Sequence, residues 1–178
     1  MVSGIFRIIL ALDLMNIADA ITILDKEIAN PQMGLPDEVF RFISRITPLI
    51  NVDLLIKDES GRTLLSWRDD QYSGTGWHIP GGIIRFKETT KARIKNVAEA
   101  EIGVEVKFDP NPIAINQIIN NEWDIRGHFI SILYKCSLSS AFILKNKDLK
   151  ETNPGYLKWH ESCPENLLKF HDIYRKYL

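Results

Sequence analysis

The sequence has little cysteine and little surplus charge, and each shortage excludes a class of protein. Its 178 residues include two cysteines, Cys136 and Cys163, which form no C-x-x-C pair. They make neither a disulfide framework nor a zinc site, so a reducing, cytoplasmic location fits best. With 22 basic and 23 acidic side chains the formal charge is −1. That balance gives no reason to expect a nucleic-acid polymer or a membrane as partner.

Long apolar runs are missing as well. In the N-terminal segment only Ile8–Leu12 is continuously apolar, and aspartates interrupt the residues after it, so neither a membrane span nor a signal peptide is expected. Apolar residues instead recur at helical spacing: Ile5, Ile8, Ile9, Leu12, Ile17, Ala20, Ile21, Leu24 and Ile28. We expect an amphipathic helix that packs on the domain or on a partner subunit. It belongs to a helical extension over residues 1–36, ahead of a domain over 37–178.

Alternating and helical patterns follow one another along the rest of the chain, without an internal repeat. We predict helices over 37–44, 89–102 and 164–177, strands over 49–56, 63–67, 104–108, 113–119, 128–136 and 156–159, and a tight turn at Gly81-Gly82. Because helices and strands interleave, the fold class is α/β or α+β with a mixed β-sheet.

The stretch GWHIPGGIIRFKETTKARIKNVAEAEIGV, residues 76–104, carries the most specific pattern. Gly82 is followed by Glu88, Glu101 and Gly103 at the spacing of G-x5-E-x7-R-E-U-x-E-E-x-G-U, where U is a bulky aliphatic residue. This resembles the Nudix box. In that family a strand, a loop and a helix present glutamates to Mg²⁺, which neutralises the diphosphate of a nucleotide substrate. The resemblance implies a Nudix-type α/β/α sandwich with a mixed β-sheet.

Two acidic positions of that box are apolar in this chain. Val97 and Ala100 fall where two of three metal glutamates belong, and Asn96 falls at the arginine. The GDP-mannose mannosyl hydrolases lack the same two glutamates, and their box is similar to residues 97–103. Their lead-in strand is similar to residues 44–53. The resemblance implies a different bond: water attacks the anomeric carbon, and free sugar and a nucleoside diphosphate leave.

The resemblance also assigns roles to single residues. Glu101, with the backbone carbonyl of Gly81 or Gly82, is expected to hold a single Mg²⁺, and Glu101 counts as catalytic. Arg68 is expected to bind the diphosphate and to act in catalysis. The branch has an arginine directly after the glycine pair, and Arg85, two residues beyond that position, is expected to reach the phosphates instead.

Three further residues complete these expectations. Asp53 lies on an otherwise apolar strand, so it needs a hydrogen-bond partner or a substrate group. Glu88 is expected to cap the helix that follows it. The branch has a Gln-His pair near its last aromatic strand, which supplies a metal ligand and the general base. Asn153 aligns with the glutamine and can coordinate Mg²⁺ through its amide oxygen.

Proline stands at the position of the general base, and Pro154 cannot accept a proton. The remaining candidates are His128, His160 and Glu151, none of which a motif places. Three hypotheses therefore stand: a Mg²⁺-dependent hydrolase of a nucleoside-diphosphate sugar, a Nudix-fold module that binds such a sugar without turnover, and a diphosphatase that cleaves between phosphates. A homodimer is a further expectation.

Overall fold

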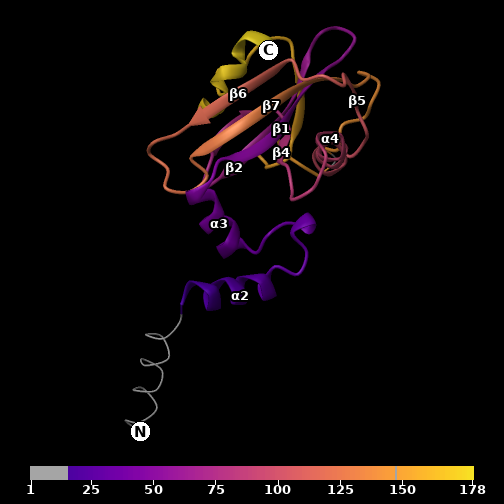
Figure 1. The fold of residues 1–178 in the computed structure, drawn as a ribbon. Helices are drawn as coiled ribbons and strands as arrows, with labels where there is room; N and C mark the ends of the chain where they lie inside the picture. Colours follow the sequence, from indigo (N-terminus) through magenta and orange to yellow (C-terminus); the bar gives the residue numbers. More distant parts are fainter. Residues whose placement is uncertain (1–15, 147) are drawn as a thin grey trace.

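The computed structural model describes residues 16–146 and 148–178, and its centre is a mixed eight-stranded sheet (Figure 1). The strands are β1 (Leu49–Lys57), β2 (Thr63–Asp70), β3 (Gly74–His78), β4 (Gly81–Ile83), β5 (Lys107–Phe108), β6 (Ala114–Ile119), β7 (His128–Ser137) and β8 (Leu157–His160). Their order is β3-β2-β1-β7-β5, while β4 pairs with β1, β6 with β7 and β8 with β2. β1 and β7 are parallel and the other pairs are antiparallel, which confirms the predicted mixed sheet.

The helical segments lie on both sides of this sheet and ahead of it. They are α2 (Ile17–Glu27), the 3-10 turn η1 (Pro31–Met33), α3 (Asp37–Ile46), α4 (Thr90–Val97), the π-helical turn η2 (Ala98–Ile102) and the 3-10 segment η3 (Lys169–Tyr177). None of the helices within the described ranges is both long and apolar enough to span a bilayer.

β1 shows why the sheet has two covered faces. Its side chains alternate between the faces, as in any strand. Val52, Leu54 and Ile56 pack with α4 and η2, whereas Leu55 packs with the C-terminal segment. Asp53 lies on the same face as Leu55, where it contacts Tyr174 of η3. The result is an α/β/α sandwich, as predicted, with an ionisable side chain inside one of its layers.

The glycine pair differs from the expectation. Gly81 and Gly82 do not form a tight turn but open the short strand β4, which pairs with β1 through Val52↔Gly82 and Asp53↔Gly81. Close approach, rather than a left-handed backbone, requires glycine here. A Cβ on Gly81 would lie 2.2 Å from Asp53 Oδ1, and one on Gly82 would lie 2.8 Å from Val97 Cγ2.

The box helix starts at a side-chain cap and ends in a wider turn. Thr89 accepts a hydrogen bond from the N–H of Ala92, which satisfies one free donor of the first turn. From Ala98 on the helix is π-helical, and the N–H of Gly103 bonds to the carbonyl of Ala98. Gly103 has φ +87°, a left-handed value that ends the helix. The wider turn changes the direction in which Glu101 leaves the helix.

The ends of the chain differ from the predictions in detail. The predicted closing helix is a 3-10 segment, yet Leu167 and Tyr174 are buried beneath the sheet as expected. The predicted strand 104–108 shrinks to β5. At the N-terminus, α2 has no buried residue and extends away from the sheet (Figure 1). The earlier part of the predicted helix lies outside the described residues, and both the boundary at residue 36 and the homodimer stay predictions.

Candidate active site

The outer edge of β4 carries the first element of the site. Bonds from the N–H of Leu54 to the carbonyl of Pro80, and from the N–H of Ile84 to the carbonyl of Ile50, fix the register of β4 on β1. Since paired residues alternate in an antiparallel ladder, the backbone of Gly82 faces β1 and that of Gly81 faces away. The N–H of Gly81 donates to Glu101 Oε1 at 3.3 Å. In a strand the N–H and the carbonyl of one residue point to the same side. Of the two carbonyls expected to bind the metal ion, that of Gly81 therefore points toward Glu101, and that of Gly82 points toward β1.

His78 faces the other oxygen of this carboxylate. Its Nε2 lies 3.6 Å from Glu101 Oε2, and the His78 side chain is 5% exposed. Its Nδ1 lies 2.8 Å from the carbonyl oxygen of Ser66, which can only accept, so Nδ1 carries the proton. Arg68 Nη2 lies 3.2 Å from Nε2 and can only donate. Both contacts indicate a neutral imidazole whose lone pair is on Nε2.

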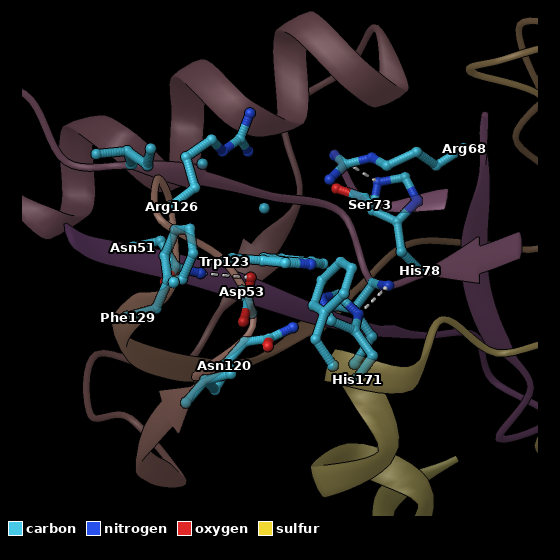
Figure 2. Close-up of a pocket in the computed structure, with 17 residues that line it drawn as sticks. Asn51, Asp53, Arg68, Ser73, His78, Asn120, Trp123, Arg126, Phe129 and His171 are labelled. Atoms are coloured by element: carbon cyan, nitrogen blue, oxygen red, sulfur yellow. Dashed lines mark hydrogen bonds between the residues drawn. The ribbon is translucent and has the colours of Figure 1, made fainter. Parts of the chain in front are cut away.

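Two arginines approach the site from different strands and loops. Arg68 comes from β2, and Arg126 from the loop between β6 and β7. Figure 2 shows both guanidinium groups on the same side of the pocket, above Asp53. Burial, together with the nearby charge of Arg68, lowers the pKa of Arg126. Arg68 Nε also lies 3.6 Å from Asp70 Oδ2, so this carboxylate offsets part of the positive charge. The two guanidinium groups that line the pocket still favour an anionic ligand.

The first pocket has a volume of about 180 Å³ and lies between β1, β4, the β6–β7 loop and the C-terminal segment. Its walls include Trp123, Phe129 and Phe170, and the rings of Trp123 and Phe170 meet edge to face with centroids 6.4 Å apart. A cavity of about 150 Å³ already holds benzene. The pocket therefore has room for one ring of a ligand, with aromatic walls on which a planar or sugar ring can pack.

A hydrogen-bonded network forms the polar floor of this pocket. Asp53 accepts from Ser131, from Tyr174 and from Asn51 Nδ2, the last at 2.8 Å. Burial raises the pKa of the Asp53 carboxyl, although these three hydrogen bonds act in the opposite direction. Burial and the Asp53 charge raise the pKa of Tyr174 well above its ordinary value. Asp53 thus has the hydrogen-bond partners that an apolar strand requires, and it also lines the pocket.

A second pocket adjoins the first and has a volume of about 420 Å³. It contains Glu101, Ala100 and Pro154, and it shares Arg68 and His78 with the first pocket. Asp69 and Asp70 also border it, but Asp69 accepts from the hydroxyl of Thr75. Asp70 Oδ1 accepts from backbone N–H groups of the β2–β3 turn, and its Oδ2 lies 3.6 Å from Arg68 Nε. Glu101 is therefore the carboxylate of this pocket that faces His78 and the edge of β4.

Glu88 is structural, but it does not cap the following helix as expected: the cap is Thr89, and Glu88 instead forms an ion pair. Arg93 donates to both carboxylate oxygens of Glu88, at 2.7 and 3.0 Å, and both side chains are 10% exposed. Asn96, at the position of the box arginine, adds a bond of 2.8 Å. Burial alone would raise the pKa of Glu88, but these hydrogen bonds and the charge of Arg93 lower it.

Two of the predicted site residues do not join the rest. Arg85 Nη1 donates to the carbonyl of Gln32 at 3.2 Å, so this side chain connects the domain to the N-terminal segment. The amide oxygen of Asn153 accepts from the N–H of Lys150 at 2.7 Å and closes a local turn. Neither residue lines either pocket, whereas Asp53, Arg68, Gly82 and Glu101 line one or both.

The candidate general bases also lie elsewhere. His128 contacts Gln117 at the start of β7, and Glu151 pairs with Lys158. His160 packs edge to face on Trp77, and burial lowers its pKa. None of the three lines the pockets, and Pro154 lines the one that holds Glu101.

Sequence reasoning missed His78, His171 and Arg126. His171 Nδ1 accepts from the N–H of Ile79 at 3.0 Å, and burial, together with the charge of Arg68, lowers its pKa well below the ordinary value. The sequence did contain signals for the other two. His78 alternates with the core residues Trp77 and Ile79 and so faces away from their layer. Arg126 lies in a polar loop that also holds an aromatic residue.

A divalent cation fits these donors only in part. The described residues contain no group of three or more His, Cys, Asp or Glu side chains that could hold an ion alone. Mg²⁺ is commonly held by one or two carboxylates together with phosphates of a ligand and water. Glu101 and the outward carbonyl of Gly81 match such a set, so the site suits an ion that is shared with a phosphorylated ligand.

Comparison with known proteins shows which fold this is. No protein-family model matches the chain. Among solved structures, it is similar to a possible asymmetric diadenosine tetraphosphate hydrolase from Jonesia denitrificans, with TM-score 0.57, 18% identity and coverage of 74% of this chain and 92% of that one. It is also similar to a MutT NUDIX hydrolase from Burkholderia pseudomallei, with TM-score 0.56, 17% identity and coverage of 74% and 98%. The chain thus has the fold of the Nudix hydrolases.

Sequence comparison adds one curated relative. The chain is 26% identical over 137 residues to the low-salt glycan biosynthesis protein Agl8 of Haloferax volcanii. The match covers 73% of this chain and 86% of that protein, so nearly the whole relative is spanned.

Proposed function

We propose that the protein is a divalent-metal-dependent hydrolase of a nucleoside-diphosphate sugar of the GDP-mannose type, in which water attacks the anomeric carbon. The observation that carries the proposal is the convergence of Arg68 and Arg126 on one pocket, beside the single carboxylate of Glu101. Two guanidinium groups can bind a diphosphate and balance its charge. The relative named for glycan biosynthesis supports a sugar-bearing substrate.

We infer which bond breaks from the small number of carboxylates that the site offers to a metal ion. Attack at phosphorus in a Nudix site relies on several carboxylates, but Val97 is 3% exposed and packs under Gly82 as part of the core. Cleavage at the anomeric carbon needs charge balance on the departing diphosphate, which Arg68 and Arg126 supply. Mg²⁺, bound by Glu101 and the carbonyl of Gly81, would add to that balance. The aromatic pocket would hold a ring of the substrate.

A second candidate function is binding of the nucleotide sugar without turnover. Pro154 favours it, because a residue that cannot accept a proton borders the pocket of Glu101. A general base contributes about 10²–10⁴-fold to a rate, so its absence leaves either a slow enzyme or a binding module.

Incubation with GDP-mannose and Mg²⁺, followed by separation of products, distinguishes these functions. Free mannose and GDP support the proposal. Mannose phosphate and GMP would show cleavage between phosphates and would overturn it. If calorimetry detects binding of GDP-mannose but no product forms over hours, the protein is a binding module rather than an enzyme. Glu101→Gln should abolish metal binding and turnover, and Glu99→Gln, an exposed neighbour on the same turn, should change neither.

A further inference from the structure

We propose that His78 is a ligand of the divalent cation, so that the centre holds its ion with one nitrogen and one carboxylate. This inference rests on the proposed function, since it takes the same metal site and adds a donor to it. The ion class changes with the donor. Imidazole nitrogen favours ions such as Fe²⁺, Ni²⁺ and Zn²⁺, whereas carboxylate, carbonyl and water oxygens suit Mg²⁺ and Mn²⁺.

The first argument is that two electron-pair donors face each other. The Nδ1 proton of His78 is held by the carbonyl of Ser66, which leaves a lone pair on Nε2. Across from it, at 3.6 Å, is Glu101 Oε2. No proton lies on that line, because an imidazolium N–H at Nε2 would collide with the donating Nη2 of Arg68. The lone pair now accepts from Arg68, and a metal ion that replaced this donor would be shared by Nε2 and the carboxylate.

The second argument is geometric. Two ligands at about 2.1 Å from one ion, at angles of roughly 90–110°, lie about 3.0–3.4 Å apart. The observed 3.6 Å is only slightly longer. Both donors are also held in place: Ser66 fixes the imidazole through its far nitrogen, as outer partners of metal-binding histidines do, and the N–H of Gly81 holds Glu101 Oε1.

Arg68 connects this ion to the diphosphate. Its Nη2 now donates to the same lone pair that the ion would take. Metal binding to Nε2 would therefore free Nη2 of Arg68, a residue that borders both pockets. The freed Nη2 is then available to a phosphate oxygen.

The test uses Mn²⁺ alone as probe and pulsed electron paramagnetic resonance as readout. Bound Mn²⁺ in the wild-type protein should show the ¹⁴N modulation of a directly coordinated imidazole. His78→Gln should lose that modulation and weaken Mn²⁺ binding by at least about tenfold, the lower end for loss of a supporting residue. It should also narrow the preference of the site for Ni²⁺ over Mg²⁺. His128→Gln is the matched control, since His128 lines neither pocket, and it should leave the spectrum unchanged.

The wild-type spectrum decides even if His78→Gln does not fold. Bound Mn²⁺ without ¹⁴N modulation would overturn nitrogen ligation. If Glu101→Gln then abolished the binding, the metal site of the proposed function would still stand. If Mn²⁺ binding survived Glu101→Gln, that site would fall as well.

Discussion

At the scale of single residues, the two missing glutamates of the box are not equivalent. Val97 is buried, and its side chain packs against the backbone of Gly82. Ala100 is exposed and lines the pocket that contains Glu101. The first replacement belongs to the core and the second to the site. A glutamate is therefore compatible with the packing at position 100 but not at position 97.

Restoring each glutamate should separate these roles. Val97→Glu buries an unpaired carboxylate and should cost roughly 3 kcal/mol or more of unfolding free energy. Ala100→Glu should change stability by less than about 0.5 kcal/mol, and it should tighten Mg²⁺ binding because it adds a carboxylate beside Glu101. Urea denaturation and calorimetric Mg²⁺ titration measure the two effects. Equal stability losses in both variants would contradict this assignment.

Pro154 offers a gain-of-function prediction. It borders the pocket of Glu101, at the position where the similar branch has its general base. Pro154→His, alone or with Asn153→Gln, should raise the rate of sugar release from GDP-mannose, by up to about 10²–10⁴-fold. Pro164→His is the control, since Pro164 lines neither pocket. An unchanged rate in the folded Pro154→His variant would count against a site of this branch.

Asp53 should give the protein a specific pH dependence. Its pKa in the folded state lies above the ordinary value, because burial disfavours the charged form. The folded state therefore binds more protons, and stability falls as the pH rises from the unfolded pKa through the folded one. Asp53→Asn lacks this loss, which is about 1.4 kcal/mol for each pH unit that separates the two pKa values.

The measurement is the unfolding free energy of both proteins in urea at about pH 4 and about pH 8. The wild-type protein should lose stability relative to Asp53→Asn between the two values. Ser137→Ala, a change on the exposed end of β7, serves as control and should follow the wild type. If the wild-type protein instead gained stability relative to Asp53→Asn at the higher pH, the pKa of Asp53 would be lowered by folding rather than raised, and this prediction would be wrong.

At the scale of elements, β4 joins the sheet to the box helix, and its two glycines face different neighbours. A methyl group on Gly81 meets a carboxylate oxygen and a backbone oxygen that cannot withdraw, whereas one on Gly82 meets a valine methyl. Gly81→Ala should cost about 3 kcal/mol or more, and Gly82→Ala about 1–3 kcal/mol. Val97→Ala should relieve Gly82→Ala but not Gly81→Ala. Thermal denaturation of the single and double variants tests this, and equal relief in both pairs would contradict it.

Periodicity predicted most elements, because strands and helices of useful length carry their burial pattern in the sequence. It could not predict the β4 strand, since three residues are too few for a period and a glycine pair is equally typical of a turn. Spacing placed Glu101, but His78, which faces it, comes from a strand partner, and Arg126, which lines the adjoining pocket, comes from a distant loop. Their proximity depends on the β1–β7 and β2–β3 pairings, which no local pattern encodes.

At the scale of the whole molecule, the two ends of the chain contribute unequally to the core. Deletion of residues 1–36 removes no buried residue among those described and should lower the Tm by no more than about 4 °C. Deletion of residues 164–178 uncovers Trp77, Leu133 and their neighbours and should prevent cooperative folding. Calorimetry of both truncated proteins provides the comparison. Loss of folding in the first would show that the extension is part of the domain.

The boundary shared by the two pockets makes the affinities for their occupants interdependent. Arg68 and His78 border both pockets, so a movement of either side chain changes the shape and charge of both pockets. By reciprocity, if a cation strengthens the hold on a ring-bearing anion by some factor, the anion must strengthen the hold on the cation by the same factor. A titration with the cation alone or with the anion alone then underestimates the affinity of the site. A titration of one of them in the presence of saturating amounts of the other would measure the full affinity.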